Sequence, residues 1–184
     1  MLVNAFNPAR VYSVKISIAC KKYRSSPMSA KDDFFKKMRE NVEEERAAVD
    51  AVKDDITVFQ REIAFLFENI ELWFRDSGVR CERKEIFLTA GNAPHARYQI
   101  QELCLTHGNK SLYIVPQGLY YFGGAKGCIL VSIGNDRSDK KLFELRMQDS
   151  RANFENWAII DHQKPHHVTP FNEENFFKLI YDFS

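Results

Sequence analysis

The feature that most constrains this chain is a stretch from Ser29 to Ser77 that contains neither glycine nor proline. Apolar side chains recur within it at steps of three and four residues, which is the spacing of one face of an α-helix. Only Glu45 interrupts this apolar series. The heptad a positions are Phe35, Val42, Val49, Ile56, Ile63 and Ile70. Such a stripe predicts a coiled coil, or a long helix packed along its length.

The ends of this stretch carry helix-terminating residues. Ser29 followed by Asp32 is typical of a helix N-cap, and Gly78 stands where a glycine often ends a helix. A single helix over 29–77 would be about 70 Å long, so we expect part of it to project or to pair. The alternative is two ordinary helices that break near Asp54, with Asp55 as the cap of the second.

The two halves of the stretch differ in their apolar width. Residues 29–55 carry a narrow stripe in a charged surround, whereas residues 56–77 add further large apolar side chains. The wider face predicts that the second half docks on the C-terminal domain. The first half then meets a second copy, another protein or the same chain. The expected interaction seam consists of Phe35, Met38, Val42, Val49, Val52 and Ile56.

Two features of the heptads favour parallel pairing. β-branched residues at position a are typical of two-stranded parallel coiled coils. The e positions are Arg39, Arg46 and Lys53, and these like charges would face one another in an antiparallel pair.

After Gly78 the apolar period shortens, and turn residues separate short runs. This pattern predicts an antiparallel meander followed by a helix at 173–182 that Asn172 caps. The expected strands are 80–88, 97–106, 111–115, 119–122, 128–133, 141–148 and 156–160. The predicted class is therefore α+β: a long helix over 29–77, then an antiparallel sheet domain with a C-terminal helix over 78–184.

Residues 1–28 form a basic segment without an acidic residue. Residues 11–19 alternate between apolar and polar, which is a strand pattern. Met28 opens a run that resembles a natural protein start. The segment is therefore either an edge strand or a tail that comes from an over-long start assignment.

Composition bears on which partners the protein can be expected to bind and on its cellular location. The net charge of +1 gives no reason to expect a nucleic acid or an anionic membrane as partner. No apolar run is long enough to span a membrane, and the N-terminal residues lack the apolar segment of a signal peptide, so we expect none. Cys20, Cys81, Cys104 and Cys128 form no C-x-x-C pair, which favours reduced thiols in a cytoplasmic protein.

Three segments contain residue types that support catalysis or ligand binding. The loop at 161–167 contains His162, His166 and His167, a candidate metal site whose spacing matches no defined motif. A solvated surface loop is the more usual interpretation of such a cluster. The glycine-rich segment 123–127 fits a hairpin turn better than a phosphate loop, because a strand pattern follows it. Asp136 with Glu144 and Arg146 resembles a nuclease pair only faintly, since arginine replaces the usual lysine.

No family resemblance emerges from these motifs. The expected function is that of a non-enzymatic protein–protein interaction module, without a cofactor, that forms homo-oligomers or binds a partner protein through the long helix. Bacterial or phage accessory proteins of the antitoxin or immunity type have this character. The alternative is a metal-dependent hydrolase or nuclease that uses the His162–His167 loop.

Overall fold

The computed structural model describes residues 29–90, 93–121, 124–135, 140–155 and 157–184. The strand expected at 11–19 and the acidic residue Asp136 lie outside these ranges. The chain divides into two compact units, Met1–Asn41 and Val42–Ser184. The sheet domain and its core belong to the second unit.

The long helix predicted from the heptads is present as α1, Ala30–Trp73. It runs through Asp54 and Asp55 without a break, so the alternative of two helices is wrong. Ser29 caps it: its Oγ accepts a hydrogen bond from the Asp32 backbone N–H at 3.2 Å, as a capping box requires. The helix ends four residues earlier than predicted, and turns lead to Gly78, which adopts a φ of 79°.

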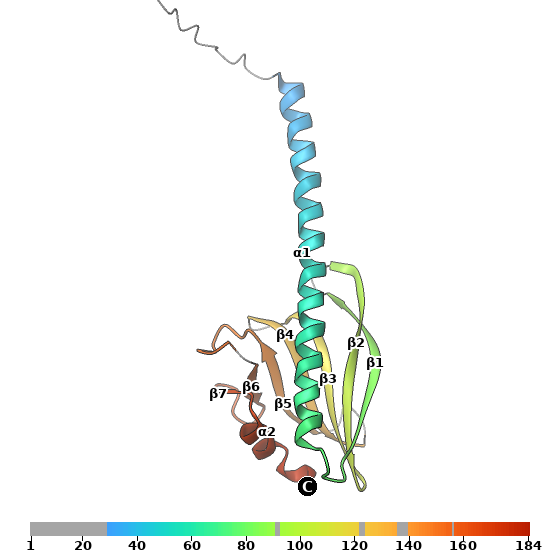
Figure 1. Cartoon of the computed structure of the whole chain (residues 1–184). Coiled ribbons are helices and arrows are strands. Elements are labelled where there is room, and N and C mark those ends of the chain that lie inside the picture. The colour runs from blue at the N-terminus through green and yellow to red at the C-terminus, as the bar shows by residue number, and fades with distance from the viewer. Residues whose placement is uncertain (1–28, 91–92, 122–123, 136–139, 156) are drawn as a thin grey trace, which may run out of the picture. The chain divides into compact units, whose positions relative to one another are not determined.

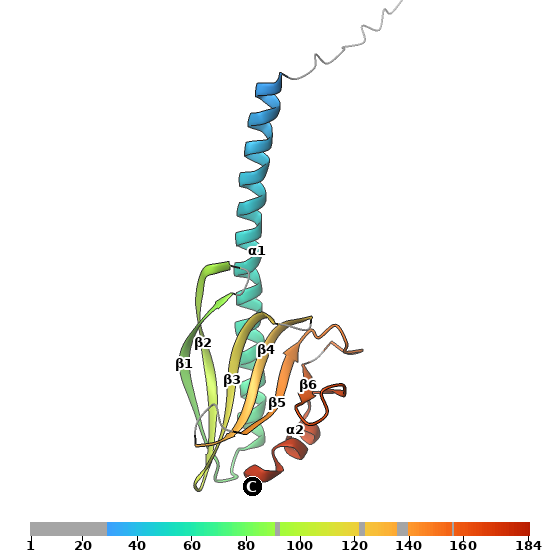
Figure 2. The ribbon, with the colours of Figure 1, turned by 180° about the vertical axis from the view of Figure 1, so that it is seen from behind.

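Within the described residues the sheet has seven strands, and neighbours in sequence pair antiparallel. Figures 1 and 2 show this meander from opposite sides. The strands are β1 (Arg80–Ala90), β2 (Ala93–His107), β3 (Lys110–Tyr121), β4 (Ala125–Gly134), β5 (Lys140–Met147), β6 (Ala158–Asp161) and β7 (Val168–Pro170).

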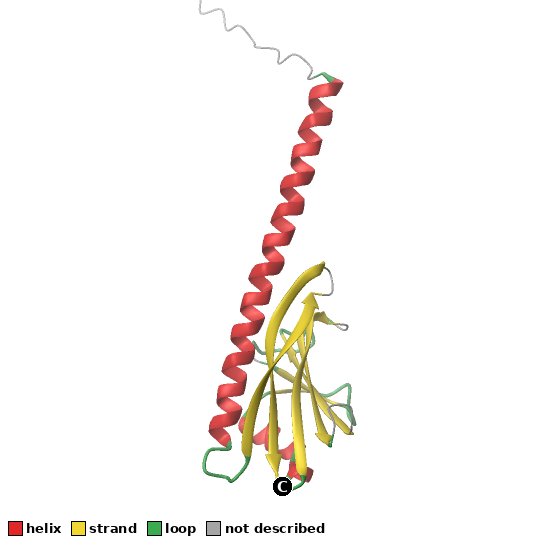
Figure 3. Cartoon of the chain, turned by 90° about the vertical axis from the view of Figure 1, so that its right-hand side faces the viewer, coloured by secondary structure: helices red, strands yellow, loops and turns green. Residues whose placement is uncertain are grey.

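Successive side chains along each strand point to opposite faces of the sheet. Gly127 faces the ring of Phe59 on α1, so the odd-numbered residues of β4, such as Ile129, point toward the helix. Ile129 pairs with Leu145 of β5, and both side chains are fully buried. We call this the inner face and its opposite the outer face. Figure 3 shows α1 beside one face of the sheet.

The second helix closes the core beside the end of α1. It spans Glu173–Leu179, and Asn172 caps it by accepting a hydrogen bond from the Asn175 backbone N–H at 2.9 Å. A 3-10 turn, Tyr181–Phe183, follows. Phe176 is fully buried and lies edge-on to Phe74 and Phe143. Aromatic side chains at such edge-on angles account for much of the burial at this end of the domain.

Apart from shifts of a few residues at several strand ends, the sheet differs from the sequence prediction in two ways. The expected strands 111–115 and 119–122 are one strand, β3, whose register shifts between Pro116 and Gly118. Proline lacks a backbone donor and is therefore tolerated at such an irregularity, which the sequence pattern reads as a turn. The short strand β7 was missed, because a strand of three residues has too little periodicity to recognise.

A candidate interaction surface on the long helix

The N-terminal half of α1 exposes large apolar side chains. The exposed fractions are 45% for Phe35, 49% for Met38, 63% for Val42 and 49% for Val49. These four residues, hereafter the exposed seam, follow the heptad spacing that was predicted from sequence. Exposed apolar side chains that gather along one stripe, unlike scattered ones, are typical of contact surfaces.

The other two predicted seam residues belong to the protein's own core. Val52 is only 7% exposed, and Ile56 is partly buried and packs against the core cluster. Farther along the same stripe, Phe59 and Ile63 are fully buried. The sequence predicts docking from residue 56, whereas the stripe is already buried at Val52.

Charged residues that flank the exposed seam form ion pairs with neighbours on the same helix. Lys53 Nζ lies 2.9 Å from Asp50 Oδ1, and Lys36 Nζ lies 3.7 Å from Glu40 Oε1. The hydrogen bond and charge of Lys53 lower the pKa of Asp50, and Arg46 adds to this effect. These pairs are solvated, so they keep the helix surface polar around the seam without adding much stability.

An ion pair at the rim of the sheet lies just beyond the exposed seam. Lys126 Nζ lies 2.6 Å from Asp55 Oδ1, and the Tyr120 hydroxyl donates a hydrogen bond of 2.6 Å to Asp55 Oδ2. These hydrogen bonds from Lys126 and Tyr120 lower the pKa of the Asp55 carboxyl. The contacts tie α1 to β3 and β4, and they give Asp55 a role in tertiary packing rather than in helix capping.

The glycine-rich segment has a packing role in the structure. A Cβ atom added to Gly127 would overlap the Phe59 ring, so the glycine lets β4 approach the helix closely. Phe59 in turn lies 6.4 Å from the ring of Trp157. The ammonium of Lys126 is paired with Asp55. This geometry agrees with a hairpin-flanking segment rather than a phosphate cradle.

The three histidines predicted as a metal site lie on the loop between β6 and β7. His162 Nε2 is 3.8 Å from Glu144 Oε1, whereas His166 and His167 are exposed. Within the described ranges, no group of three or more histidine, cysteine, aspartate or glutamate side chains is placed to hold a metal ion.

A network of ion pairs that the sequence did not predict lies on the outer face. Arg146 donates to Glu144 Oε2 through Nε at 2.9 Å and through Nη2 at 2.7 Å. Asp149, whose side chain is completely buried, accepts from Arg151 Nε at 3.0 Å and from Arg151 Nη2 at 2.9 Å. The alternation of β5 predicts that Glu144 and Arg146 share the outer face. The contribution of Asp149 depends on a turn after the strand, for which the sequence carries no signal.

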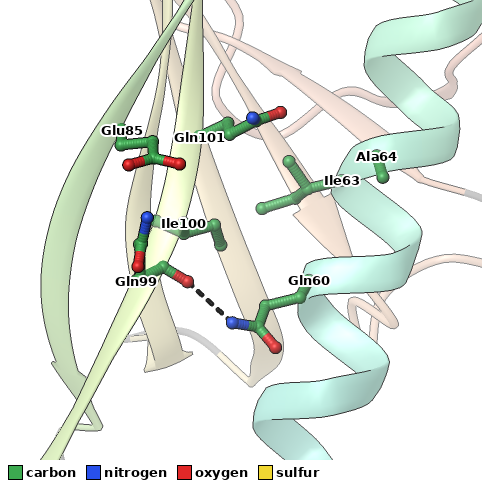
Figure 4. A pocket seen from close by; sticks show the side chains of 7 residues that line it. All are labelled: Gln60, Ile63, Ala64, Glu85, Gln99, Ile100 and Gln101. Atoms are coloured by element: carbon green, nitrogen blue, oxygen red, sulfur yellow. Dashed lines mark hydrogen bonds between the residues drawn. The ribbon is translucent and has the colours of Figure 1, made fainter.

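Two hollows on the sheet domain have different linings. Figure 4 shows a groove of about 310 Å³ between α1 and the β1–β2 hairpin, where Gln60 Nε2 donates a hydrogen bond of 2.7 Å to the Gln99 carbonyl. The amide and carboxylate side chains of Gln60, Gln101 and Glu85 line it together with Ile63. A second hollow of about 360 Å³ has aromatic walls and lies between the end of α1 and the C-terminal turn.

The remaining sequence expectations concern cysteines and membranes. Cys81, Cys104 and Cys128 are free thiols, and Cys20 lies outside the described ranges. Neither described helix combines the length and the apolar character that a membrane span needs. The chain matches no protein-family model, no curated protein and no solved structure.

Proposed function

We propose that this protein is an interaction protein that associates with itself through helix–helix pairing along the exposed seam. One observation carries the proposal: α1 buries its apolar stripe from Val52 onward, but leaves Phe35, Met38, Val42 and Val49 between 45% and 63% exposed. Coiled-coil formation buries such a stripe by inserting each side chain into a hole on the facing helix.

Pairing also gives the exposed half of the helix a source of stability. Most helical stability in proteins comes from packing of an apolar face, because propensity alone leaves isolated helices marginal. Glu45 is the exception within the stripe, since it lies at position d between Val42 and Val49. A polar residue at one such position lowers the affinity of a pair while it specifies register.

Sedimentation velocity over a wide range of protein concentration tests the proposal. We expect the unmodified chain to associate reversibly, and the Val42→Asp, Val49→Asp double variant to remain monomeric. Ala47→Asp is the matched control, because Ala47 is exposed on the opposite side of the same helical segment. A chain that stays monomeric at every concentration would overturn the proposal.

A gain-of-association variant complements this test. Glu45→Leu completes the apolar stripe and should lower the dissociation constant by roughly tenfold, the size expected for burying one additional leucine. An unchanged or weaker self-association in Glu45→Leu contradicts a contact along this stripe.

A further inference from the structure

An aromatic hollow lies where the end of α1 meets the C-terminal turn, and three parts of the sheet domain form its walls. Trp73 and Phe74 stand at the end of α1, and His107 is the last residue of β2. Phe177 lies in α2, and Phe183 in the 3-10 turn that follows it. Figures 1 and 2 show these segments side by side at one end of the sheet. The volume of about 360 Å³ lies within the range of small-molecule sites.

Hydrogen bonds hold the wall that the C-terminal turn forms. Lys110 Nζ donates to the carbonyl of Asp182 at 2.9 Å and to the carbonyl of Ser184 at 2.6 Å. Phe183, in the same turn, is only 3% exposed, and its ring lies edge-on to that of Phe74 at 6.3 Å between centroids. The hollow is therefore formed before any ligand arrives, and a preformed site loses little conformational freedom on binding.

Within the described residues, the walls of the hollow are aromatic and lack permanently charged side chains. The Phe177 ring lies 6.3 Å from that of Trp73 and 5.2 Å from that of Phe74, tilted by 51° and 54° respectively. Tilted rings of this kind offer edges and faces to a further flat ring. No carboxylate, ammonium or guanidinium belongs to the described side chains that line the hollow. A charged ligand would lose its hydration there without gaining an ionic partner, so the walls favour an uncharged, flat molecule.

The most exposed large apolar side chain of the described residues lies at this hollow. Tyr181 is 78% exposed and belongs to the residues that line it. An aromatic ring left in water beside an apolar hollow loses exposed area when it closes onto a ligand, and that loss favours binding. We therefore expect Tyr181 to cover part of a bound ligand.

Two polar side chains at the hollow restrict the hydrogen bonding of a ligand. Ser77 Oγ donates to the Phe74 carbonyl at 2.6 Å and accepts from the Val79 N–H at 3.3 Å. Its one hydrogen is therefore engaged, and the hydroxyl can only accept a further bond. The exposed His107 ring lies 6.5 Å from the Phe183 ring, and a neutral imidazole also has one accepting nitrogen. A ligand with a hydrogen-bond donor suits both side chains, and His107, the less engaged of the two in the described structure, is its main partner.

We infer that this hollow binds a small, uncharged, flat aromatic molecule that carries one O–H or N–H donor. The ring of the ligand lies against Trp73 and Phe177, and Tyr181 covers it. Its donor meets the imidazole of His107. The site does not involve the exposed seam, so it does not depend on self-association.

Three probes that share one ring system test the class of ligand. Indole carries an N–H donor, N-methylindole lacks it, and indole carboxylate adds a charge. Titration of the isotope-labelled full-length chain at pH 8, followed by NMR, measures each affinity. We expect saturable binding of indole, with chemical-shift changes at the hollow. N-methylindole should bind about fivefold more weakly for the loss of one hydrogen bond, and indole carboxylate at least about tenfold more weakly.

Substitutions of exposed side chains supply the variants, so we expect the fold to persist. Tyr181→Ala and His107→Ala should each weaken indole binding at least about threefold, and His107→Ala should also narrow the difference between indole and N-methylindole. Phe65→Ala is the matched control, because Phe65 is 56% exposed and does not line the hollow. Lack of saturable indole binding, equal affinity for indole and its carboxylate, or unchanged binding in Tyr181→Ala would overturn the inference.

Discussion

The guanidinium of Arg83 on β1 and the carboxylate of Glu71 on α1 meet through two parallel hydrogen bonds, Nε–Oε1 and Nη2–Oε2, each of 2.7 Å. The same guanidinium lies 5.8 Å from the centre of the Phe67 ring. Both charged side chains are about one quarter to one third exposed. The pair therefore fixes the edge strand of the sheet to the helix with a defined geometry, which a single-point ion pair does not provide.

We expect a double-mutant cycle of Glu71→Gln and Arg83→Gln to give a coupling free energy of about 1 kcal/mol, toward the upper end for partly exposed pairs. Urea unfolding of the four proteins measures it. Lys140 and Asp182 serve as the matched control, since they form a single contact of 2.8 Å and are more than half exposed. Equal coupling in the two cycles would show that the paired geometry adds nothing.

Gly127→Ala should destabilise the sheet domain by about 1–3 kcal/mol, because the added methyl group overlaps the fully buried Phe59 ring. Thermal or urea unfolding measures the loss. Phe59→Leu makes room at the same point, so the double variant should lose less than the sum of the two single variants. Strict additivity of the two substitutions contradicts the contact.

Val49→Asp and Val52→Asp, three residues apart on one stripe, should have different consequences. Val52 is 7% exposed within the core cluster, so an aspartate there buries a charge and should destabilise the domain by several kcal/mol. Val49→Asp should leave the melting temperature of the sheet domain nearly unchanged and reduce association only. Similar melting temperatures for the two variants would place Val52 outside the core.

The buried carboxylate of Asp149 predicts a dependence of stability on acid pH. Hydrogen bonds from Arg151 hold the pKa of Asp149 below its ordinary value of 3.8. A carboxyl whose pKa is lower in the folded state contributes stability above the unfolded pKa, and loses it as the pH falls through the folded pKa. The stability difference between the unmodified chain and Asp149→Asn should therefore be full at pH 6 and shrink below about pH 4.

Urea midpoints measured between pH 6 and pH 2 test this expectation. Asp50→Asn is the control, because the Asp50–Lys53 pair is exposed on the helix surface and should contribute little at any pH. A difference between Asp149→Asn and the unmodified chain that stays constant down to pH 2 would contradict the ion-pair explanation.

The cysteines should react with alkylating reagents in an order set by burial. Burial raises the pKa of all three described thiols, and Cys128 is completely buried whereas Cys81 and Cys104 are partly accessible. Because the thiolate is the reactive form, we expect Cys128 to remain unmodified by iodoacetamide at pH 8 until the protein is unfolded. Mass spectrometry of digested protein locates the label, and a labelled Cys128 in the folded protein refutes the prediction.

The helix and its caps could be predicted from sequence because they rest on local patterns. The Ser29 cap, the unbroken spacing of apolar residues and the Asn172 cap each depend on residues that are close in the chain. The α+β class and the antiparallel order of strands follow from similarly local signals.

The position along α1 at which burial against the sheet begins could not be predicted from the sequence. Val49 and Val52 have the same residue type and lie on the same stripe, yet one is 49% exposed and the other 7%. The difference depends on where the hairpins end in space, which the contacts of Asp55 with Lys126 and Tyr120 help to fix. Asp149 was missed for the same reason, because its partners come together only through a turn.

The order of elements has a consequence for biosynthesis. α1 precedes every strand that the structure describes, so a ribosome releases Phe59, Phe67 and Ile70 before any of those strands. Ile129 and Leu145, which help to enclose them, emerge only with β4 and β5. The apolar face of α1 therefore stays exposed on the nascent chain through much of its synthesis. During that interval aggregation competes with folding, and chaperones can bind the exposed face.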